Sequence, residues 1–200
     1  MLNVIILSEM KRAAVRRAVF EDLRSAGARA ALIIDSADPS GPRGGSAVKA
    51  YAREGLACAV CDPLTEPLPD LSGFAVIHMS GGDPFRLLRA LRSCDLADLV
   101  AAEAAERDII VVGSSAGAMV MGEEVGHADI LCSPAGLTDT RGLGWVTGRV
   151  MPHMDKKGLH ADAMRARVAS APGDAWTLMG DGDVLRISPD LIAPPQVPIA

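Results

Sequence analysis

Short apolar runs alternate with helical segments along the first half of the chain, and this alternation constrains the fold more than any other feature. The runs lie in "LNVIILS", "ARAALIIDSA", "LACAVC", "FAVIHMS" and "IIVVG", and their apolar residues follow one another rather than standing at every second position. Such runs are typical of strands buried on both faces, in parallel sheets whose crossover helices cover both sides. The sequence therefore predicts an α/β three-layer sandwich with a mostly parallel central sheet.

Helices are predicted in the segments that connect these runs. Residues 10–27 form the pattern of a helix that ends at Gly27, and residues 47–55 that of a short helix. Residues 81–108 predict two helices with a break near 93–95. These helices are the crossovers that parallel strands need.

From about Ile130 onward the pattern changes to shorter β-like pieces, "DILCS", "GLGWVTGRVMPHM" and "AWTLMGDGDVLRI", with one helix predicted from His160 to Ala171. No repeat or linker divides the chain, so residues 1–200 are interpreted as one domain with small C-terminal β elements. The proline-rich end, residues 191–200, is predicted to be a loosely held tail.

Composition narrows the classes of function. Hydrophobic residues make up 49% and charged residues 22% of the chain, close to the average of soluble globular proteins. The net charge of −5 and the lack of a Lys/Arg stripe argue against a nucleic-acid partner. The apolar start "MLNVIILS" is too short to span a membrane, so we expect a strand there, no membrane partner and a cytoplasmic protein. The composition does not decide whether the chain forms a homodimer.

The four cysteines, Cys58, Cys61, Cys94 and Cys132, do not make a disulfide framework in a chain of this length. The "CAVC" segment has the spacing of a redox or zinc site, but in a strand Cys58 and Cys61 would point to opposite faces. No second Cys/His pair in the sequence complements them. We therefore expect buried apolar cysteines and no metal site.

Two predicted strand ends carry the chemistry, because ligands of a doubly wound sheet bind at the carboxyl ends of its strands. The segment "VVGSSAGA" matches G-x-S-x-G at Gly113, Ser115 and Gly117, between a buried strand and a helix-compatible segment. In such a nucleophile elbow the Ser115 hydroxyl would project outward from a tight turn, whereas the Ser114 side chain would point back into the scaffold. A glycine-rich turn that binds phosphate, or only packs closely, fits the pattern equally well.

The other strand end, "SGGDPF", favours the catalytic interpretation. Gly81 and Gly82 would let a backbone N–H approach a substrate oxygen without a side chain in the way. Together with the N–H of Ala116, this N–H would form an oxyanion hole. Asp83 is also suited to cap a helix that begins at Pro84.

A serine nucleophile needs a base and an acid that orients the base. Of the four histidines, His153 in "RVMPHMDKKG" follows an apolar run and a proline, where an imidazole could reach the crevice. His78, in contrast, lies inside a predicted buried strand. Two carboxylates are candidates for the acid, Asp129 in "GHADIL" and Asp181 in "MGDGDVL".

These segments together resemble the peptidase E and cyanophycinase family of serine peptidases, which has a class I glutamine amidotransferase-like fold. "GGDPFRLLRAL" is similar to the family's Gly-Gly-Asn-x-Phe-x-Leu-Leu segment, "GSSAGAMVMG" to its Gly-x-Ser-Ala-Gly-Ala elbow, and "MPHM" to its Pro-His-Phe. "TLMGDGDVLRI" resembles its closing acidic hairpin, so the similarity extends in order from about Leu2 to Ile187.

The resemblance implies roles for the residues that match the family's motifs. It makes Ser115 the nucleophile and His153 the base. It supports Gly82 and Ala116 as the oxyanion donors, with Gly81 as part of the substrate site.

The resemblance identifies the nucleophile and the base by close motif matches, but it matches the acid and the substrate-binding residues only loosely. Asp129 matches the family's aspartate between serine and histidine after a one-residue gap, and Asp181, in the later hairpin, is the alternative acid. Asp83 stands where the family has asparagine, which puts a negative charge beside the oxyanion hole and the substrate. Arg165 and Arg167 loosely match the family's Arg-x-Arg and are candidates for binding a substrate carboxylate; a solvent-facing helix surface is the alternative.

The sequence thus predicts a serine peptidase that hydrolyses short peptides through an acyl-enzyme. The resemblance to peptidase E implies an aspartyl residue on the N-terminal side of the scissile bond. No metal or cofactor is expected. An isopeptidase of the cyanophycinase type, or a non-catalytic amidotransferase-like module that binds a small ligand, are the alternatives. A glutamine amidotransferase is not expected, because the elbow has no cysteine.

Overall fold

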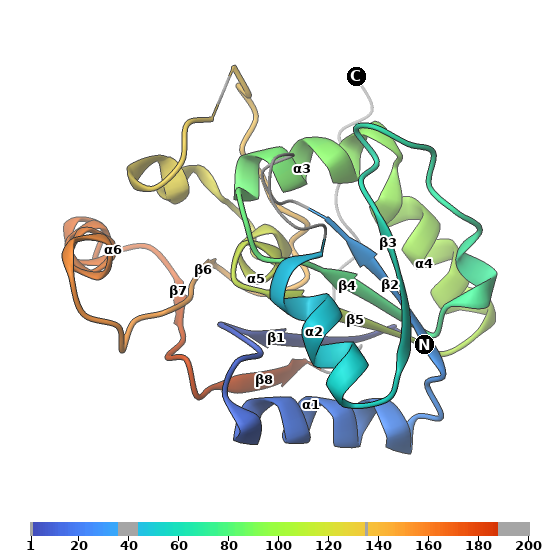
Figure 1. The fold of residues 1–200 in the computed structure, drawn as a ribbon. Helices are drawn as coiled ribbons and strands as arrows, with labels where there is room; N and C mark the ends of the chain where they lie inside the picture. Colours follow the sequence, from blue (N-terminus) through green and yellow to red (C-terminus); the bar gives the residue numbers. More distant parts are fainter. Residues whose placement is uncertain (1, 36–43, 135, 188–200) are drawn as a thin grey trace.

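The computed structural model describes residues 2–35, 44–134 and 136–187 and has a six-stranded sheet at its centre (Figure 1). The strands are β1 (Leu2–Leu7), β2 (Ala30–Ile34), β3 (Ala57–Cys61), β4 (Val76–Met79), β5 (Ile109–Ser114) and β8 (Val184–Ile187). Their order is β3-β2-β4-β5-β1-β8, and all neighbours are parallel except β8, which runs antiparallel to β1. The mostly parallel sheet predicted from the apolar runs is therefore confirmed. The predicted tail, residues 191–200, lies outside the described residues.

Helices cover both faces of this sheet and complete the predicted three layers (Figure 1). One face carries α1 (Ala13–Ser25) and α2 (Gly45–Arg53), and the other α3 (Pro84–Ser93), α4 (Leu96–Glu106) and α5 (Ala116–Met121). In β1, Val4 and Ile6 join the core beside α3, α4 and α5, whereas Ile5 and Leu7 join the core beside α1 and α2. Successive side chains of a strand point to opposite faces, so a strand covered on both sides is apolar at every position.

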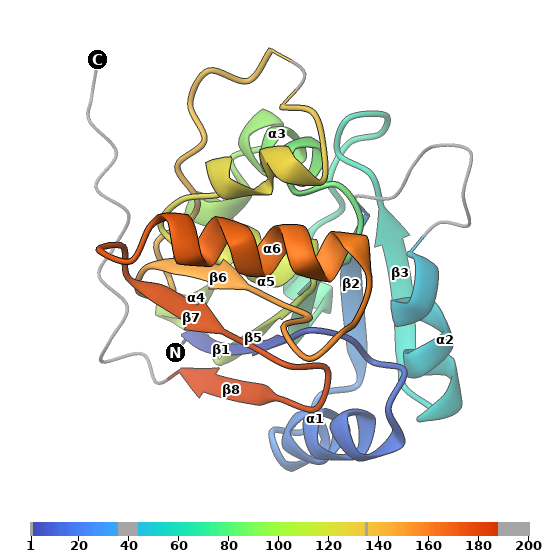
Figure 2. The same cartoon turned by 90° about the vertical axis from the view of Figure 1, so that its left-hand side faces the viewer.

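A smaller group of elements lies beyond the end of the sheet at which β1 and β5 finish (Figure 1). It contains the parallel strands β6 (Arg149–Met151) and β7 (Trp176–Leu178) and the helix α6 (Leu159–Ser170), which is in front in Figure 2. The helix expected from His160 to Ala171 is thus confirmed to within one residue at each end. No helix in the described ranges is long and apolar enough to cross a membrane.

Two predictions for the last third of the chain are wrong. The segment "DILCS" is not a strand, because a 3₁₀ helix spans Gly126–Ile130 and a turn follows it. The closing segment is not a hairpin, because β7 pairs with β6 whereas β8 pairs with β1 in the main sheet. The turn between β7 and β8 therefore bridges the two sheets, which places its residues close to both.

β3 is an edge strand, and its exposure differs from that of the inner strands. Its residues alternate between exposed and partly buried positions up to Cys61, which is buried. Cys58 packs against the core beside α1 and α2, whereas Cys61 belongs to the core on the other face, as the strand period of two predicts. Among the residues described, no cluster of three or more His, Cys, Asp or Glu side chains could hold a metal ion.

The Asp83 carboxylate caps α3, as the sequence predicts. Its Oδ1 accepts hydrogen bonds from the N–H groups of Phe85 at 2.8 Å and Arg86 at 3.2 Å, and Pro84 occupies the first helical position. The negative charge that distinguishes Asp83 from the family's asparagine is therefore directed at the start of α3, where the backbone dipoles favour it.

Replacing Asp83 tests this cap. Asp83→Ala should lower the free energy of unfolding by about 1 kcal/mol, because two N–H groups of α3 lose their acceptor. Asp83→Asn should change it by about 0.3 kcal/mol or less, because an amide oxygen caps a helix about as well. Urea denaturation measures both values against the wild type. Equal losses in the two variants would contradict the capping role.

Candidate active site

A cavity of about 230 Å³ opens where several strands end, at the carboxyl edge of the main sheet. Its lining comes from the segments that follow β1, β4, β5 and β6 and from the start of α2. Both strand ends singled out in the sequence contribute, through Gly81 and Gly82 after β4 and through Ser114 and Ser115 at the end of β5. The structure therefore has a crevice where a parallel sheet is expected to bind ligands.

Ser115 occupies a strained turn between β5 and α5. Its backbone angles are φ 53° and ψ −110°, and a positive φ is uncommon for residues other than glycine because Cβ crowds the backbone. The Ser115 N–H donates to the carbonyl of Leu7 at 3.0 Å, which anchors the turn to β1. A Cβ at Gly117 would lie only 2.0 Å from the carbonyl oxygen of Met79, so the helix can approach β4 only with glycine there. The tight strand-to-helix turn predicted from the small residues is confirmed.

The two serines of this turn have different partners. The hydroxyl of Ser114, which is buried, contacts Nε2 of His78 at 2.9 Å. The hydroxyl of Ser115 instead contacts Nε2 of His153 at 3.0 Å. Nδ1 of His78 contacts the hydroxyl of Tyr51 at 3.2 Å, so one buried imidazole joins β4, β5 and α2. Burial disfavours the charged imidazolium and lowers the pKa of His78 to about 3. Ser114 and the neutral His78 therefore belong to the scaffold behind the turn.

His153 follows β6 and forms a hydrogen bond on each side of its ring. The Ser115 hydroxyl donates to Nε2, with Oγ and Nε2 3.0 Å apart, and Nδ1–H donates to Oδ1 of Asp181. A carboxylate only accepts hydrogen bonds, so Asp181 fixes the tautomer in which Nε2 is free to take a proton. The backbone N–H of His153 donates to Oγ of Ser8 at 3.1 Å, which ties His153 to the end of β1. Ser115, His153 and Asp181 thus form one hydrogen-bonded series.

Two backbone N–H groups lie beside Ser115 with no acceptor. Gly82 lines the cavity with φ 149°, and Ala116 is the first residue of α5. Neither N–H donates a hydrogen bond within residues 2–35, 44–134 and 136–187. A Cβ on Gly81 would lie 3.2 Å from Cβ of Ser115, so the glycine segment after β4 approaches the serine closely. Gly82 lines the same cavity as Ser115, and Ala116 is the next residue, so both N–H groups are candidate donors to a substrate oxygen.

The structure does not bring Asp129, the first choice for the acid, to His153. Asp129 lies in the 3₁₀ helix Gly126–Ile130, and its carboxylate forms an ion pair with Arg167 of α6 at 2.6 Å. The carboxylate at His153 is that of Asp181, which lies in the turn between β7 and β8 and is only 4% exposed. The resemblance favoured Asp129, because it matches the aspartate between serine and histidine, whereas Asp181 reaches the imidazole because β8 pairs with β1.

The other side chains expected to bind substrate also lie outside the cavity lining. Arg167 is held by its ion pair on the surface, and the Asp83 carboxylate is bound to the first turn of α3. Arg165 donates to the backbone carbonyls of Met154 at 3.2 Å and Lys156 at 2.9 Å. Arg165 therefore supports the loop after β6 instead of facing a substrate carboxylate.

Three charged side chains that line the cavity were not singled out from the sequence: those of Glu9, Lys11 and Lys156. Nζ of Lys156 lies 3.6 Å from Oδ2 of Asp181 and 3.9 Å from Oε2 of Glu9, and Nζ of Lys11 lies 4.0 Å from the same Glu9 oxygen. Glu9 could have been found, because it follows the first strand and parallel strands end at one edge. The sequence contains one indication that Lys156 lies at the cavity, which is its position three residues after His153.

Comparisons with known proteins agree with this fold. The sequence model of peptidase family S51 matches residues 46–193, a range that includes Ser115, His153 and Asp181. A putative peptidase E protein from Listeria monocytogenes EGD-e is similar in structure, with a TM-score of 0.74 and 19% sequence identity over 93% of this chain and 98% of that chain. A peptidase from an acI-B1 Actinobacterium has a TM-score of 0.61 and 19% identity over 92% of this chain and 82% of that chain. No curated protein sequence matches the chain.

Proposed function

Because the chain belongs to peptidase family S51 and is a serine peptidase, we propose that it hydrolyses short peptides through a triad of Ser115, His153 and Asp181. The observation that carries the proposal is the 3.0 Å contact between Oγ of Ser115 and Nε2 of His153, whose other nitrogen donates to Asp181. This distance is within the range that a nucleophile and its base require. A module that only binds a ligand would have no need of this alignment.

Each member of the triad has one task in the acylation step. His153 takes the Ser115 proton at Nε2 as Oγ attacks the peptide carbonyl, and Asp181 stabilises the imidazolium that forms. The N–H groups of Gly82 and Ala116 donate to the oxyanion of the tetrahedral intermediate. When the C–N bond breaks, His153 gives the proton to the leaving amine. Water, deprotonated by His153, then attacks the ester, so that Ser115 regains its proton and the acid product leaves.

The size and charge of the cavity support a short, charged substrate. Its volume of about 230 Å³ is below the roughly 300–1,000 Å³ of sites for drug-sized ligands, which favours a peptide of a few residues. Lys11 and Lys156 can attract a substrate carboxylate, and Glu9 can attract a free α-ammonium group. Every free dipeptide carries both groups, and an N-terminal aspartate adds a second carboxylate for the two lysines. We infer that such a dipeptide is the substrate. Since Arg165 and Arg167 are engaged elsewhere, the lysines replace them as candidate cations.

A panel of dipeptides tests the reaction and the substrate class together. We expect kcat/KM for Asp-Leu to be at least about tenfold above that for Asn-Leu, which corresponds to about 1.4 kcal/mol from one carboxylate. N-acetyl-Asp-Leu should also be a poorer substrate, because it lacks the ammonium group. Ser115→Ala should lose at least about 10⁴-fold in activity.

Two outcomes of this panel would contradict the proposal. Preferential cleavage of a β-linked Asp-Arg substrate would favour the isopeptidase alternative over the dipeptidase. If the wild type cleaves no member, and a fluorophosphonate does not label Ser115, the triad does not act as proposed.

Asparagine substitutions distinguish the two candidate acids. Asp181→Asn should lower kcat by about 10²–10⁴-fold, because an amide at Nδ1 can donate and favour the wrong imidazole tautomer. Asp129→Asn is the matched control and should stay within about twofold of the wild type, because it loses only a partly exposed ion pair. Steady-state kinetics measure both, and urea midpoints show whether each variant is folded. A folded Asp181→Asn enzyme of normal activity would rule out Asp181.

A further inference from the structure

The two carboxylate oxygens of Asp181 have different partners. Oδ1 accepts the hydrogen bond from His153, and Oδ2 lies 3.6 Å from Nζ of Lys156. The Asp181 side chain is 6% exposed, and among the described residues Lys156 is the only Lys or Arg with a nitrogen within 4 Å of it. A buried carboxylate is costly unless opposite charge or donors compensate it. Lys156 therefore supplies the positive charge that Asp181 faces while His153 is neutral.

Lys156 belongs to the same loop as His153, and this loop is fixed at several points. The Met154 N–H donates to the carbonyl of Met179 at 2.9 Å, and the Lys156 N–H donates to the carbonyl of His153 at 3.1 Å, which closes a turn. From α6, Arg165 donates to two carbonyls of the loop, one of them that of Lys156. The backbone of Lys156 is thus held relative to the imidazole, although 43% of its side chain is exposed.

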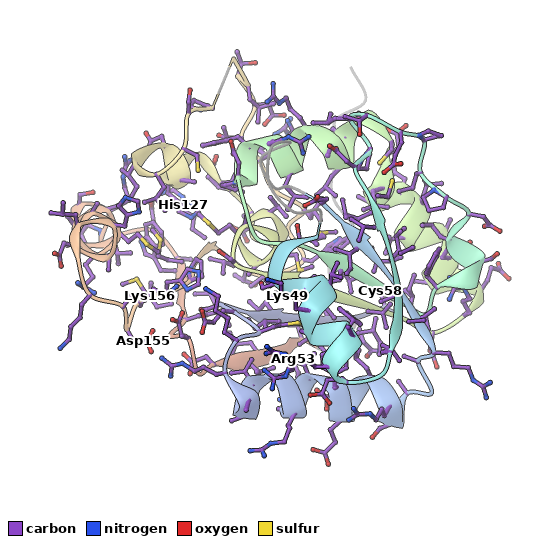
Figure 3. All side chains as sticks on the ribbon, in the orientation of Figure 1. Lys49, Arg53, Cys58, His127, Asp155 and Lys156 are labelled. Carbon is purple, nitrogen blue, oxygen red and sulfur yellow. The ribbon has the colours of Figure 1, made fainter. Side chains whose placement is uncertain are left out.

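Other charged groups surround the acid from neighbouring segments. Figure 3 shows Asp155 and Lys156 on the loop between α6 and the ends of the central strands. Asp155 accepts the Asp181 N–H at 2.8 Å and pairs with Arg12 at 3.1 Å, and these contacts lower the pKa of Asp155. The titratable and charged groups around Asp181 are, after β1, Glu9, Lys11 and Arg12; after β6, His153, Asp155 and Lys156; on α6, Arg165; and in its own turn after β7, Asp183.

We propose that Lys156 is a positioning residue of the peptidase, which fixes Oδ2 of Asp181 and sets the pH at which His153 becomes an active base. The proposal rests on the function proposed above, because it uses the roles given there to Asp181 and His153. Without the ammonium group, the carboxylates of Asp181 and Glu9 are less compensated and favour the imidazolium form of His153. Activity then begins at a higher pH. Without Lys156, the Asp181 carboxylate is held only through Oδ1 and orients the imidazole of His153 less firmly, which lowers kcat.

Lys156→Met tests the proposal, because it removes the charge and keeps an unbranched side chain. The acid limb of the kcat–pH profile should move up by roughly 0.5 to 1 pH unit, and kcat at the optimum should fall about threefold or more. The same shift should appear in the rate at which an uncharged fluorophosphonate labels Ser115, which does not depend on how a charged peptide binds. Lys156→Arg keeps the cation and should return the limb to within about 0.2 pH unit of the wild type.

Lys157→Met is the matched control, because Lys157 is the next residue, is exposed, and has no ion pair within the described part of the chain. Its profile should superimpose on that of the wild type, although its net charge changes by the same amount. If Lys156→Met keeps the wild-type profile, or Lys157→Met shifts it equally, the role of Lys156 is wrong while the proposed function stands. If the wild type cleaves no peptide and Ser115 is not labelled, the proposed function fails and this role fails with it.

Discussion

The turn at Ser115 is the constraint on which the site depends, since its backbone is unfavourable and the neighbouring strands hold it in place. A residue in such a conformation costs on the order of 1–3 kcal/mol, so its surroundings must stabilise it. The carbonyl of Leu7 in β1 accepts the Ser115 N–H, and Gly117 lets α5 contact the carbonyl of Met79 in β4. The parallel sheet fixes both carbonyls. The serine hydroxyl is therefore presented at the carboxyl edge by the core of the fold.

The proposed base and the proposed acid come from the smaller group of elements. His153 follows β6 and Asp181 follows β7, and these two strands pair with each other, not with the main sheet. One hydroxyl joins the two parts: Oγ of Ser8, at the end of β1, accepts the N–H of His153 at 3.1 Å and donates to the carbonyl of Met179 at 3.4 Å. The alignment of His153 with Ser115 therefore depends on how β6 and β7 dock against the end of β1.

The features that could be predicted from the sequence have local causes. Continuous apolar runs indicated strands covered on both faces, and the small residues around Ser115 indicated a turn with no room for side chains. The acid could not be chosen in this way, because Asp129 and Asp181 both lie in segments that the sequence predicts as short β-like pieces. The pairing of β8 with β1, which brings Asp181 to the imidazole, has no local signal in the sequence. Arg165 was ambiguous for a chemical reason, since a guanidinium can donate to backbone carbonyls as well as to a carboxylate. The contact of Ser114 with His78 likewise joins residues from two strands and left no local pattern.

Ser115 as nucleophile, with Gly82 and Ala116 as oxyanion donors, is tested most directly by a crystal structure of the enzyme after reaction with a fluorophosphonate. The bound phosphonyl group is tetrahedral and carries an oxygen where the intermediate would carry its negative charge. We expect a covalent bond between Oγ of Ser115 and phosphorus, with the phosphonyl oxygen about 2.7–3.1 Å from the backbone nitrogens of both Gly82 and Ala116. Attachment to another residue, or a phosphonyl oxygen directed away from both nitrogens, would contradict this arrangement.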